Sequence, residues 1–272
     1  MDFDNKVEET AEHIHGNKKA YPSVGQAFAL IGVYVLITVA VALPIELIKR
    51  LVDPAYTSLL NVLTYALSMF LLLFFGIRMR KSIKFSWKWV SLPILLLSIP
   101  LILSLSVLME PLVDLIPMPQ LIKDYFNSII INDIYSFLMI AILAPFIEEL
   151  IFRGIVLNGF LKRYSPTKAI ILSALIFGVA HLNPWQFPGA FILGLIMGWL
   201  YWKTNSLIPG MVLHFLNNSL SFLMMMMTHD NFITTQQLMG GGKAYYILYG
   251  MCVPIFVGSV FLIQLRLKMR EG

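Results

Sequence analysis

The sequence predicts an all-α protein: a polytopic membrane helix bundle of about eight transmembrane helices with a buried polar catalytic site. Of its 272 residues, 58% are hydrophobic and 13% are charged, whereas soluble domains carry about 25% charged residues. Apolar runs of about 20 residues recur along the chain, and this is the length that a transmembrane helix needs. Because a bilayer offers no water to the backbone, such runs favour helices over a barrel.

Two of the expected spans are short. The fifth and sixth hold about 15 residues each, fewer than the roughly 20 needed to cross a bilayer. Their connection, 183–188, is therefore expected to lie within the membrane depth, where protein or a water-filled cavity must surround it. Pro145 is expected to kink the fourth span. The eight spans are 23–48, 57–77, 90–109, 134–161, 168–183, 188–202, 206–227 and 244–265, and 110–133 is expected to be an interfacial connection.

The basic residues predict the orientation in the membrane. With both termini in the cytoplasm, 15 of the 20 lysines and arginines fall on inner segments and four on outer ones, with Arg153 inside the bilayer. Cytoplasmic loops carry such an excess, so the net charge of +5 indicates a bilayer rather than a nucleic acid as the partner. We expect an integral protein of a bacterial cytoplasmic membrane.

The chain divides into four parts by composition. Polar and apolar stretches alternate along the chain, and the changes between them set the boundaries of the four parts. The sequence does not predict an oligomeric state. The parts are 1–23, a cytoplasmic N-terminal tail without signal-peptide character; 24–133, the first three transmembrane helices with their connections; 134–227, a catalytic core that carries the polar motifs; and 228–272, the last transmembrane helix with a basic C-terminal tail.

Three ionisable residues interrupt the fourth span. Charges inside a membrane are costly and usually mark a functional site. Glu149 and Arg153 are four residues apart, so they share a helix face and are expected to form an ion pair. Glu148 lies about 100° away from Glu149 around the helix, so it cannot pair with Arg153 in the same geometry. The spacing therefore predicts one structural carboxylate beside one available for chemistry.

Further polar residues fall at a similar depth on other spans. His181, His214 and Asn218 each lie roughly 16–20 Å or more from the inner ends of their helices, at a rise of 1.5 Å per residue, and Glu148 lies about as deep. Each has a structural interpretation alone: a helix cap for His181, and interhelical hydrogen bonds for His214 and Asn218. A single layer that holds all four favours a catalytic site.

These residues form three ordered motifs, Glu148-Glu149-x-x-x-Arg153, Phe177-x-x-x-His181 and His214-x-x-x-Asn218. The set resembles the CPBP intramembrane proteases, the family named for CAAX prenyl proteases and bacteriocin-processing proteins and also called Abi. The resemblance covers roughly residues 135–225. It implies a glutamic endopeptidase without a cofactor.

The resemblance also implies a role for each motif residue. Glu148 acts as general base and, with His181, holds and activates a water molecule. His214 and Asn218 hydrogen-bond the oxyanion, and Glu149 with Arg153 supports the site. The implied substrate is a peptide or protein, with lipidated, CAAX-like and bacteriocin-like peptides as candidates.

Other interpretations remain open from the residues. A zinc peptidase could use His181, His214 and Glu148, since two histidines and a carboxylate form a catalytic zinc set; against it, His-Glu-x-x-His is absent. A non-catalytic immunity or scaffold protein would not require Glu148. A transporter could relay protons through these groups, but no internal repeat supports it.

Overall fold

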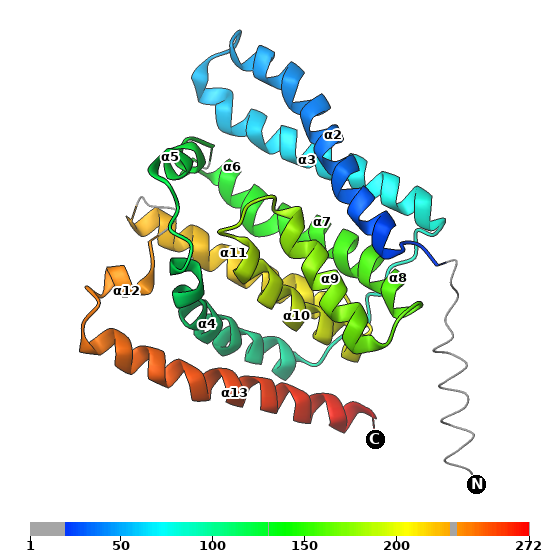
Figure 1. The fold of residues 1–272 in the computed structure, drawn as a ribbon, viewed down its shortest axis with the longest axis vertical. Helices are drawn as coiled ribbons and strands as arrows, with labels where there is room; N and C mark the ends of the chain where they lie inside the picture. The colour runs from blue at the N-terminus through cyan, green and yellow to red at the C-terminus, as the bar shows by residue number, and fades with distance from the viewer. Residues whose placement is uncertain (1–19, 130, 229–232, 272) are drawn as a thin grey trace.

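The computed structural model describes residues 20–129, 131–228 and 233–271, and Figure 1 shows them as a bundle of helices. The predicted all-α class is confirmed. Most of the predicted N-terminal tail, residues 1–19, lies outside the described residues. The helices are α2 (Val24–Lys49), α3 (Thr57–Arg80), α4 (Leu92–Asp114), α5 (Gln120–Ile129), α6 (Ile134–Phe137), α7 (Ala144–Glu149), α8 (Asn158–Leu161), α9 (Pro166–Ala180), α10 (Phe187–Thr204), α11 (Ile208–Thr228), α12 (Thr235–Leu238) and α13 (Lys243–Glu271).

Within the described part of the chain, six helical segments are long and apolar enough to cross a membrane. They are α2, the segment Pro54–Arg80 that contains α3, the segment Leu92–Leu112 of α4, the segment Ile134–Leu161, α11, and the segment Lys243–Met269 of α13. The remaining two of the eight expected spans correspond to α9 and α10, of 15 and 18 residues. A polytopic helical membrane bundle is confirmed. The expected connection 110–133 contains the end of α4 and the separate helix α5.

The segment that carries the two glutamates is a continuous but irregular helix. Between α6, α7 and α8 it contains two π-helical stretches, Leu138–Leu143 and Leu150–Leu157. Pro145 lies in the first turn of α7, directly after the first stretch. The proline therefore lies between two π-helical stretches that flank both glutamates, and π-helical turns inside helices occur frequently at functional sites.

Side chains from other helices bind carbonyl groups of this irregular helix. The amide of Asn218 on α11 donates to the Ile140 carbonyl over 2.8 Å. The Ser173 hydroxyl on α9 donates to the Phe152 carbonyl over 3.2 Å, and the Arg80 guanidinium donates to the carbonyl of Gly154. A π-helical turn leaves backbone groups without their usual i→i−4 partners, so these contacts help to hold the distortion in place.

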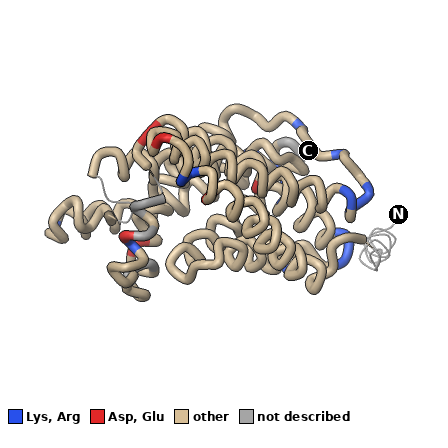
Figure 2. Tube along the Cα trace, turned by 90° about the horizontal axis from the view of Figure 1, so that it is seen from above, with Lys and Arg blue, Asp and Glu red and all other residues tan. Residues whose placement is uncertain are grey.

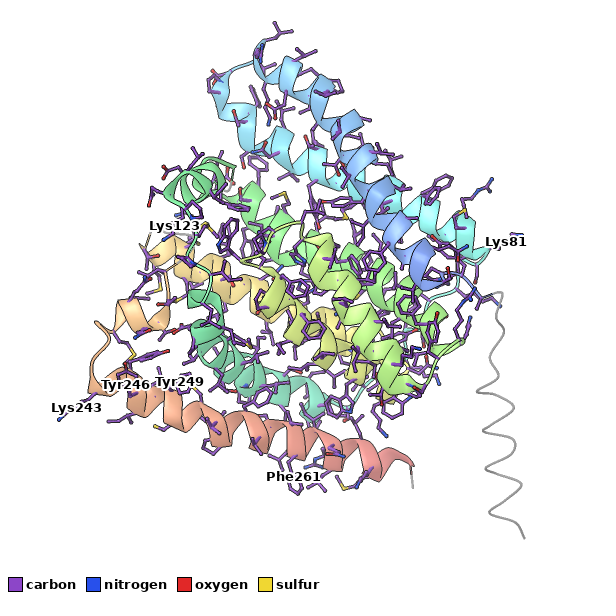
Figure 3. All side chains as sticks on the ribbon, viewed as in Figure 1. Lys81, Lys123, Lys243, Tyr246, Tyr249 and Phe261 are labelled. Atoms are coloured by element: carbon purple, nitrogen blue, oxygen red, sulfur yellow. The ribbon has the colours of Figure 1, made fainter. Side chains whose placement is uncertain are left out.

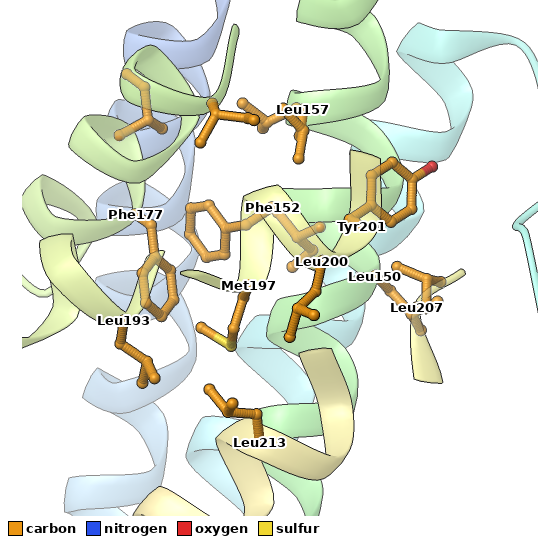
Figure 4. Packing of buried hydrophobic residues seen from close by; sticks show 14 of the residues in the cluster. Leu150, Phe152, Leu157, Phe177, Leu193, Met197, Leu200, Tyr201, Leu207 and Leu213 are labelled. Carbon is orange, nitrogen blue, oxygen red and sulfur yellow. The ribbon is translucent and has the colours of Figure 1, made fainter. Parts of the chain in front are cut away.

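The core lies where this helix packs against α9 and α10. Figure 4 shows Phe152 beside Phe177, with Leu193, Met197 and Leu200 of α10 close to them. All eight residues of Leu150–Leu157 are buried, and α9 packs extensively on α10. Two helix pairs surround this centre: α2 with α3, and α4 with α13. Glu149, Arg153 and Phe177, three of the predicted motif residues, are therefore buried in this packed centre.

The charges separate along the bundle. Figure 2 shows most lysines and arginines at one end and acidic residues mainly at the other. In Figure 3, Lys81 lies at the opposite end from Lys123 and Lys243, which is the separation expected for an inner loop and two outer ones. Phe261 projects from the outer side of α13 in the same view, and its side chain is exposed, as suits a surface that faces lipid.

Candidate active site

Glu148 lies on α7 and is held by a residue from a distant helix. The Tyr65 hydroxyl, on α3, donates to Oε1 of Glu148 over 2.8 Å. The other oxygen, Oε2, lies 3.8 Å from Nε2 of His214, and 14% of the Glu148 side chain is exposed. This carboxylate thus has one oxygen in a hydrogen bond and one beside a histidine.

Glu149 points into the core instead. Its Oε1 accepts a 2.6 Å hydrogen bond from Nη1 of Arg153, and both side chains are almost fully buried. The predicted ion pair is therefore present. Arg153 also stacks over the ring of Phe177, with 4.4 Å between Cζ and the ring centroid, and its Nη2 approaches the carbonyl of Gly194 on α10 at 3.4 Å. The pair joins the irregular helix to α9 and α10.

His214, on α11, lies between the two carboxylates. Its Nδ1 is 3.3 Å from Oε1 of Glu149. Because an ionised carboxylate only accepts hydrogen bonds, the proton on Nδ1 points at Glu149 and Nε2 faces Glu148. The side chain is buried. Glu149 therefore orients both the arginine and the histidine, which is the arrangement expected of a supporting carboxylate.

His181 ends α9 and is oriented by its own helix. Its Nδ1 lies 2.9 Å from the carbonyl of Phe177. A carbonyl oxygen only accepts, so Nδ1 carries the proton and Nε2 is an acceptor. The Phe177 ring meets His181 and His214 edge-on, at centroid distances of 5.0 and 5.7 Å. This phenylalanine, which the motif contains without a stated role, packs against both histidines.

Glu148 and His181 line one cavity of about 230 Å³. Water occupies about 30 Å³ per molecule in the liquid, so the space suits several waters or a substrate side chain. Its walls come from α2, α3, the irregular helix, α9 and the turn after α9. Besides the two motif residues, the lining is mostly apolar, with Tyr34, Tyr65 and Gln186 as further polar members; the apolar lining is Ala27, Leu30, Ile31, Met69, Leu72, Ile151, Phe152, Ile176, Ala180 and Leu182.

Asn218 lies away from this lining. Besides its bond to the Ile140 carbonyl, its Oδ1 accepts a 3.0 Å hydrogen bond from the amide of Asn217. A primary amide has two N–H donors, so the bond to Ile140 uses one of them. The structure thus brings Glu148 and His181 together in the cavity lining. His214 lies beside Glu148 without lining the cavity, and Asn218 supports the first π-helical stretch.

Two residues that contribute to the site, Tyr65 and Gly210, lie outside the sequence motifs. Tyr65 contacts Glu148 although 83 residues separate them. A Cβ at Gly210 on α11 would lie 2.5 Å from Oε2 of Glu149, so a larger residue at this position would displace the Glu149 carboxylate. Tyr65 left a faint signal, since it lies among Asn61, Thr64 and Ser68 in an otherwise apolar span. Gly210 left none beyond its place one turn before His214.

Within the described ranges, no group of three or more His, Cys, Asp and Glu side chains converges closely enough to hold a metal ion. The zinc set suggested by the sequence, His181, His214 and Glu148, is therefore not assembled as a group of ligands in this arrangement.

The fold and the site define a class of protein: a polytopic helical membrane protein with a buried glutamate–histidine site. The family described as "Type II CAAX prenyl endopeptidase Rce1-like" matches residues 130–220, a range that contains all three motifs. The match confirms the predicted resemblance: this part of the chain is similar to a family of membrane endopeptidases. The chain is accordingly an integral membrane protein.

The name of a curated relative states no activity. The "Uncharacterized 24.3 kDa protein" of Escherichia coli is 33% identical over 110 residues. The alignment covers 39% of this chain and 51% of the relative, so the chain spans about half the length of the relative that it matches. No solved structure matches the chain.

Proposed function

We propose that this chain is an intramembrane endopeptidase that hydrolyses a peptide bond with water activated by Glu148 and His181. The observation that carries the proposal is the cavity that both residues line, together with Oε2 of Glu148, which lies beyond hydrogen-bond length from His214. A general base must lie within hydrogen-bond reach of the water that it deprotonates, and this cavity has room for that water.

The chemistry proceeds in two steps. Oε2 of Glu148 takes one proton from the water while the water oxygen forms a bond to the scissile carbonyl carbon, and the electron pair of the C=O π bond moves to the carbonyl oxygen. The tetrahedral intermediate then collapses. The C–N bond breaks, and the leaving nitrogen takes the proton from Glu148. Nε2 of His181, an acceptor in the present hydrogen bonding, orients the water through its second hydrogen.

The oxyanion needs donors in the low-dielectric site, where each is worth a few kcal/mol. Our proposal assigns His214 and Asn218 to this task. His214 requires a proton on Nε2, and Glu149 next to Nδ1 stabilises the resulting imidazolium. Asn218 contributes its second N–H, with a shift of its side chain towards His214, one helical turn away on α11.

The substrate is proposed to be a peptide or protein with an apolar or lipid-modified residue near the cleaved bond. The mostly apolar walls of the cavity support this class. CAAX-like and bacteriocin-like peptides are the first candidates. We also propose a bacterial cytoplasmic membrane with both termini inside, in keeping with the basic end of the bundle (Figure 2).

The decisive experiment compares new peptide termini in membranes that contain the wild-type chain or Glu148→Gln. The change preserves the size of the side chain and removes the proton acceptor, and loss of a general base typically lowers the rate about 100- to 10,000-fold. We expect a small set of cleavage products that disappear in Glu148→Gln at equal protein amount. Identical termini in the two membranes would contradict the peptidase proposal and favour a scaffold or immunity protein.

We further propose that the enzyme uses no metal cofactor. Elemental analysis of the purified protein is expected to find zinc far below one ion per chain. About one zinc per chain, lost together with activity in His181→Ala, would replace the glutamate mechanism by the zinc alternative.

A further inference from the structure

Tyr65 lies outside the predicted motifs, and its side chain forms a hydrogen bond with Glu148. Its hydroxyl reaches Oε1 over 2.8 Å from α3, a length typical of a good O–H···O bond. The tyrosine also lines the cavity. It therefore contacts both the candidate base and the space where water and substrate would lie.

The two oxygens of Glu148 are left unequal by this contact. Oε1 is engaged by the hydroxyl, while Oε2 lies 3.8 Å from His214, beyond hydrogen-bond length. The terminal torsion of a glutamate is broad and roughly two-fold, so without a partner the carboxylate can rotate. The hydroxyl of Tyr65 restricts that rotation and leaves the lone pairs of Oε2 for a water.

We propose that Tyr65 is a positioning residue that fixes the Glu148 carboxylate so that Oε2, and not Oε1, receives the proton from water. This inference rests on the proposed peptidase function and adds a residue to it. Tyr65 acts through Glu148 and is not required to touch the scissile bond. A misplacement of about 1 Å at a reacting group can reduce a rate about 100-fold, which sets the size of the expected effect.

A simpler role would be that of a link between α3 and the irregular helix. The chain already contains such a link at the far end of α3, where the Ser58 hydroxyl donates to Oδ1 of Asp133 over 2.9 Å. Asp133 caps α6 with the same oxygen. Ser58→Ala is therefore a matched control, because it removes a hydrogen bond between the same two segments away from the cavity.

A second control matches the chemical change. Tyr201 on α10 is buried, and its hydroxyl accepts a 3.0 Å hydrogen bond from the amide of Asn158. Tyr201→Phe removes one hydrogen-bonded hydroxyl from the core without contacting Glu148. If any loss of a buried hydroxyl slowed the enzyme, this variant would be slowed as well.

The experiment measures kcat and KM on a synthetic peptide that spans a cleavage site lost in Glu148→Gln. Tyr65→Phe is expected to lower kcat roughly 10- to 100-fold with KM changed less than about threefold, since the substrate contacts remain. Ser58→Ala and Tyr201→Phe are expected to keep kcat within about threefold at temperatures where all variants are folded. An unchanged kcat in Tyr65→Phe, or an equal loss in Ser58→Ala, would overturn the inference.

If Tyr65→Phe does not fold, 3-fluorotyrosine at position 65 tests the same bond with the hydroxyl in place. The more acidic hydroxyl donates a stronger hydrogen bond to the carboxylate and makes it a weaker base, so kcat is expected to fall a fewfold at constant KM. No change in kcat would overturn the inference. Failure of the underlying function is distinguishable, because then Glu148→Gln itself would leave the cleavage products intact.

Discussion

The α2–α3 hairpin and the motif-bearing core differ sharply in how protein surrounds them. In the most apolar window of α2, 11% of the residues are buried inside the protein, against 44% for the segment Ile134–Leu161. Figure 1 shows α2 and α3 as a pair at one edge of the bundle, whereas α7 to α11 lie in the middle. The predicted site residues Glu148, Glu149 and Arg153 therefore lie on the segment with the larger buried share.

The cavity nevertheless needs both regions. The core supplies Glu148 and His181, and the hairpin supplies Tyr34 and Tyr65 as the polar part of the opposite wall. The cavity thus combines a closely packed core with a hairpin whose first helix has few protein neighbours, and matched substitutions in the two parts can test this difference.

The largest contrast is expected between two ion pairs, Glu149–Arg153 in the core and Glu46–Lys49 in the hairpin. Glu149→Gln leaves Arg153 buried without its charge partner, and breaking a buried pair from one side costs about 3–5 kcal/mol. The counterpart in the hairpin joins Glu46 to Lys49, where 59% of the Glu46 side chain is exposed. Glu46→Gln should cost less than about 1 kcal/mol, as for other exposed pairs. Thermal unfolding in detergent is the measurement.

The double variant Glu149→Gln with Arg153→Met sharpens this test. Neither unpaired charge remains, so part of the stability lost in Glu149→Gln should return, while activity stays low because His214 has lost its carboxylate. Glu148→Gln should instead keep its stability and lose activity. If Glu148→Gln unfolds the protein and Glu149→Gln is stable but inactive, the two carboxylates have been assigned the wrong way round.

The second contrast compares a glycine-to-alanine substitution in the core with one in the hairpin. A Cβ at Gly210 would lie 2.5 Å from Oε2 of Glu149, whereas a Cβ at Gly32 on α2 would meet no atom within 4 Å. Gly210→Ala should cost about 1–3 kcal/mol, as overpacked sites do, and should lower activity by displacing Glu149. Gly32→Ala should be neutral or stabilise the helix by up to about 1 kcal/mol. Equal effects on unfolding temperature would contradict the contrast between the regions.

The sequence predicted the helices well, because their ends are set locally by polar and proline residues. The first span was expected at 23–48 and is Val24–Lys49, where Ser23 forms a capping box with Gln26. The π-helical stretches were not predictable from spacing. They are held by donors on other helices, such as Ser173 and Arg80, and sequence periodicity does not contain that information.

The site was predicted unevenly for a similar reason. The Glu149–Arg153 pair follows from a local four-residue spacing and is present. Tyr65 and Gly210 reach the site only through the packing of α3 and α11, and no rule of spacing joins them to Glu148 or Glu149. Asn218 shows the converse: its motif position was recognised, but its bond to the Ile140 carbonyl depends on a π-helical turn. The roles of the motif residues stay predictions.

The smallest contrast compares two leucines. Leu200 on α10 is fully buried beside Met197 (Figure 4), while 72% of Leu36 on α2 is exposed. Since the unfolded helices also lie in lipid, the transfer part of a Leu→Ala change largely cancels. What remains is the cavity, at about 24 cal/mol per Å³, so Leu200→Ala should cost about 1–2 kcal/mol. Leu36→Ala leaves no cavity in the protein and should stay within about 0.5 kcal/mol. Unfolding temperatures in one detergent decide the matter, and a cost for Leu36→Ala as large as that for Leu200→Ala would mean that α2 is packed against protein and not lipid.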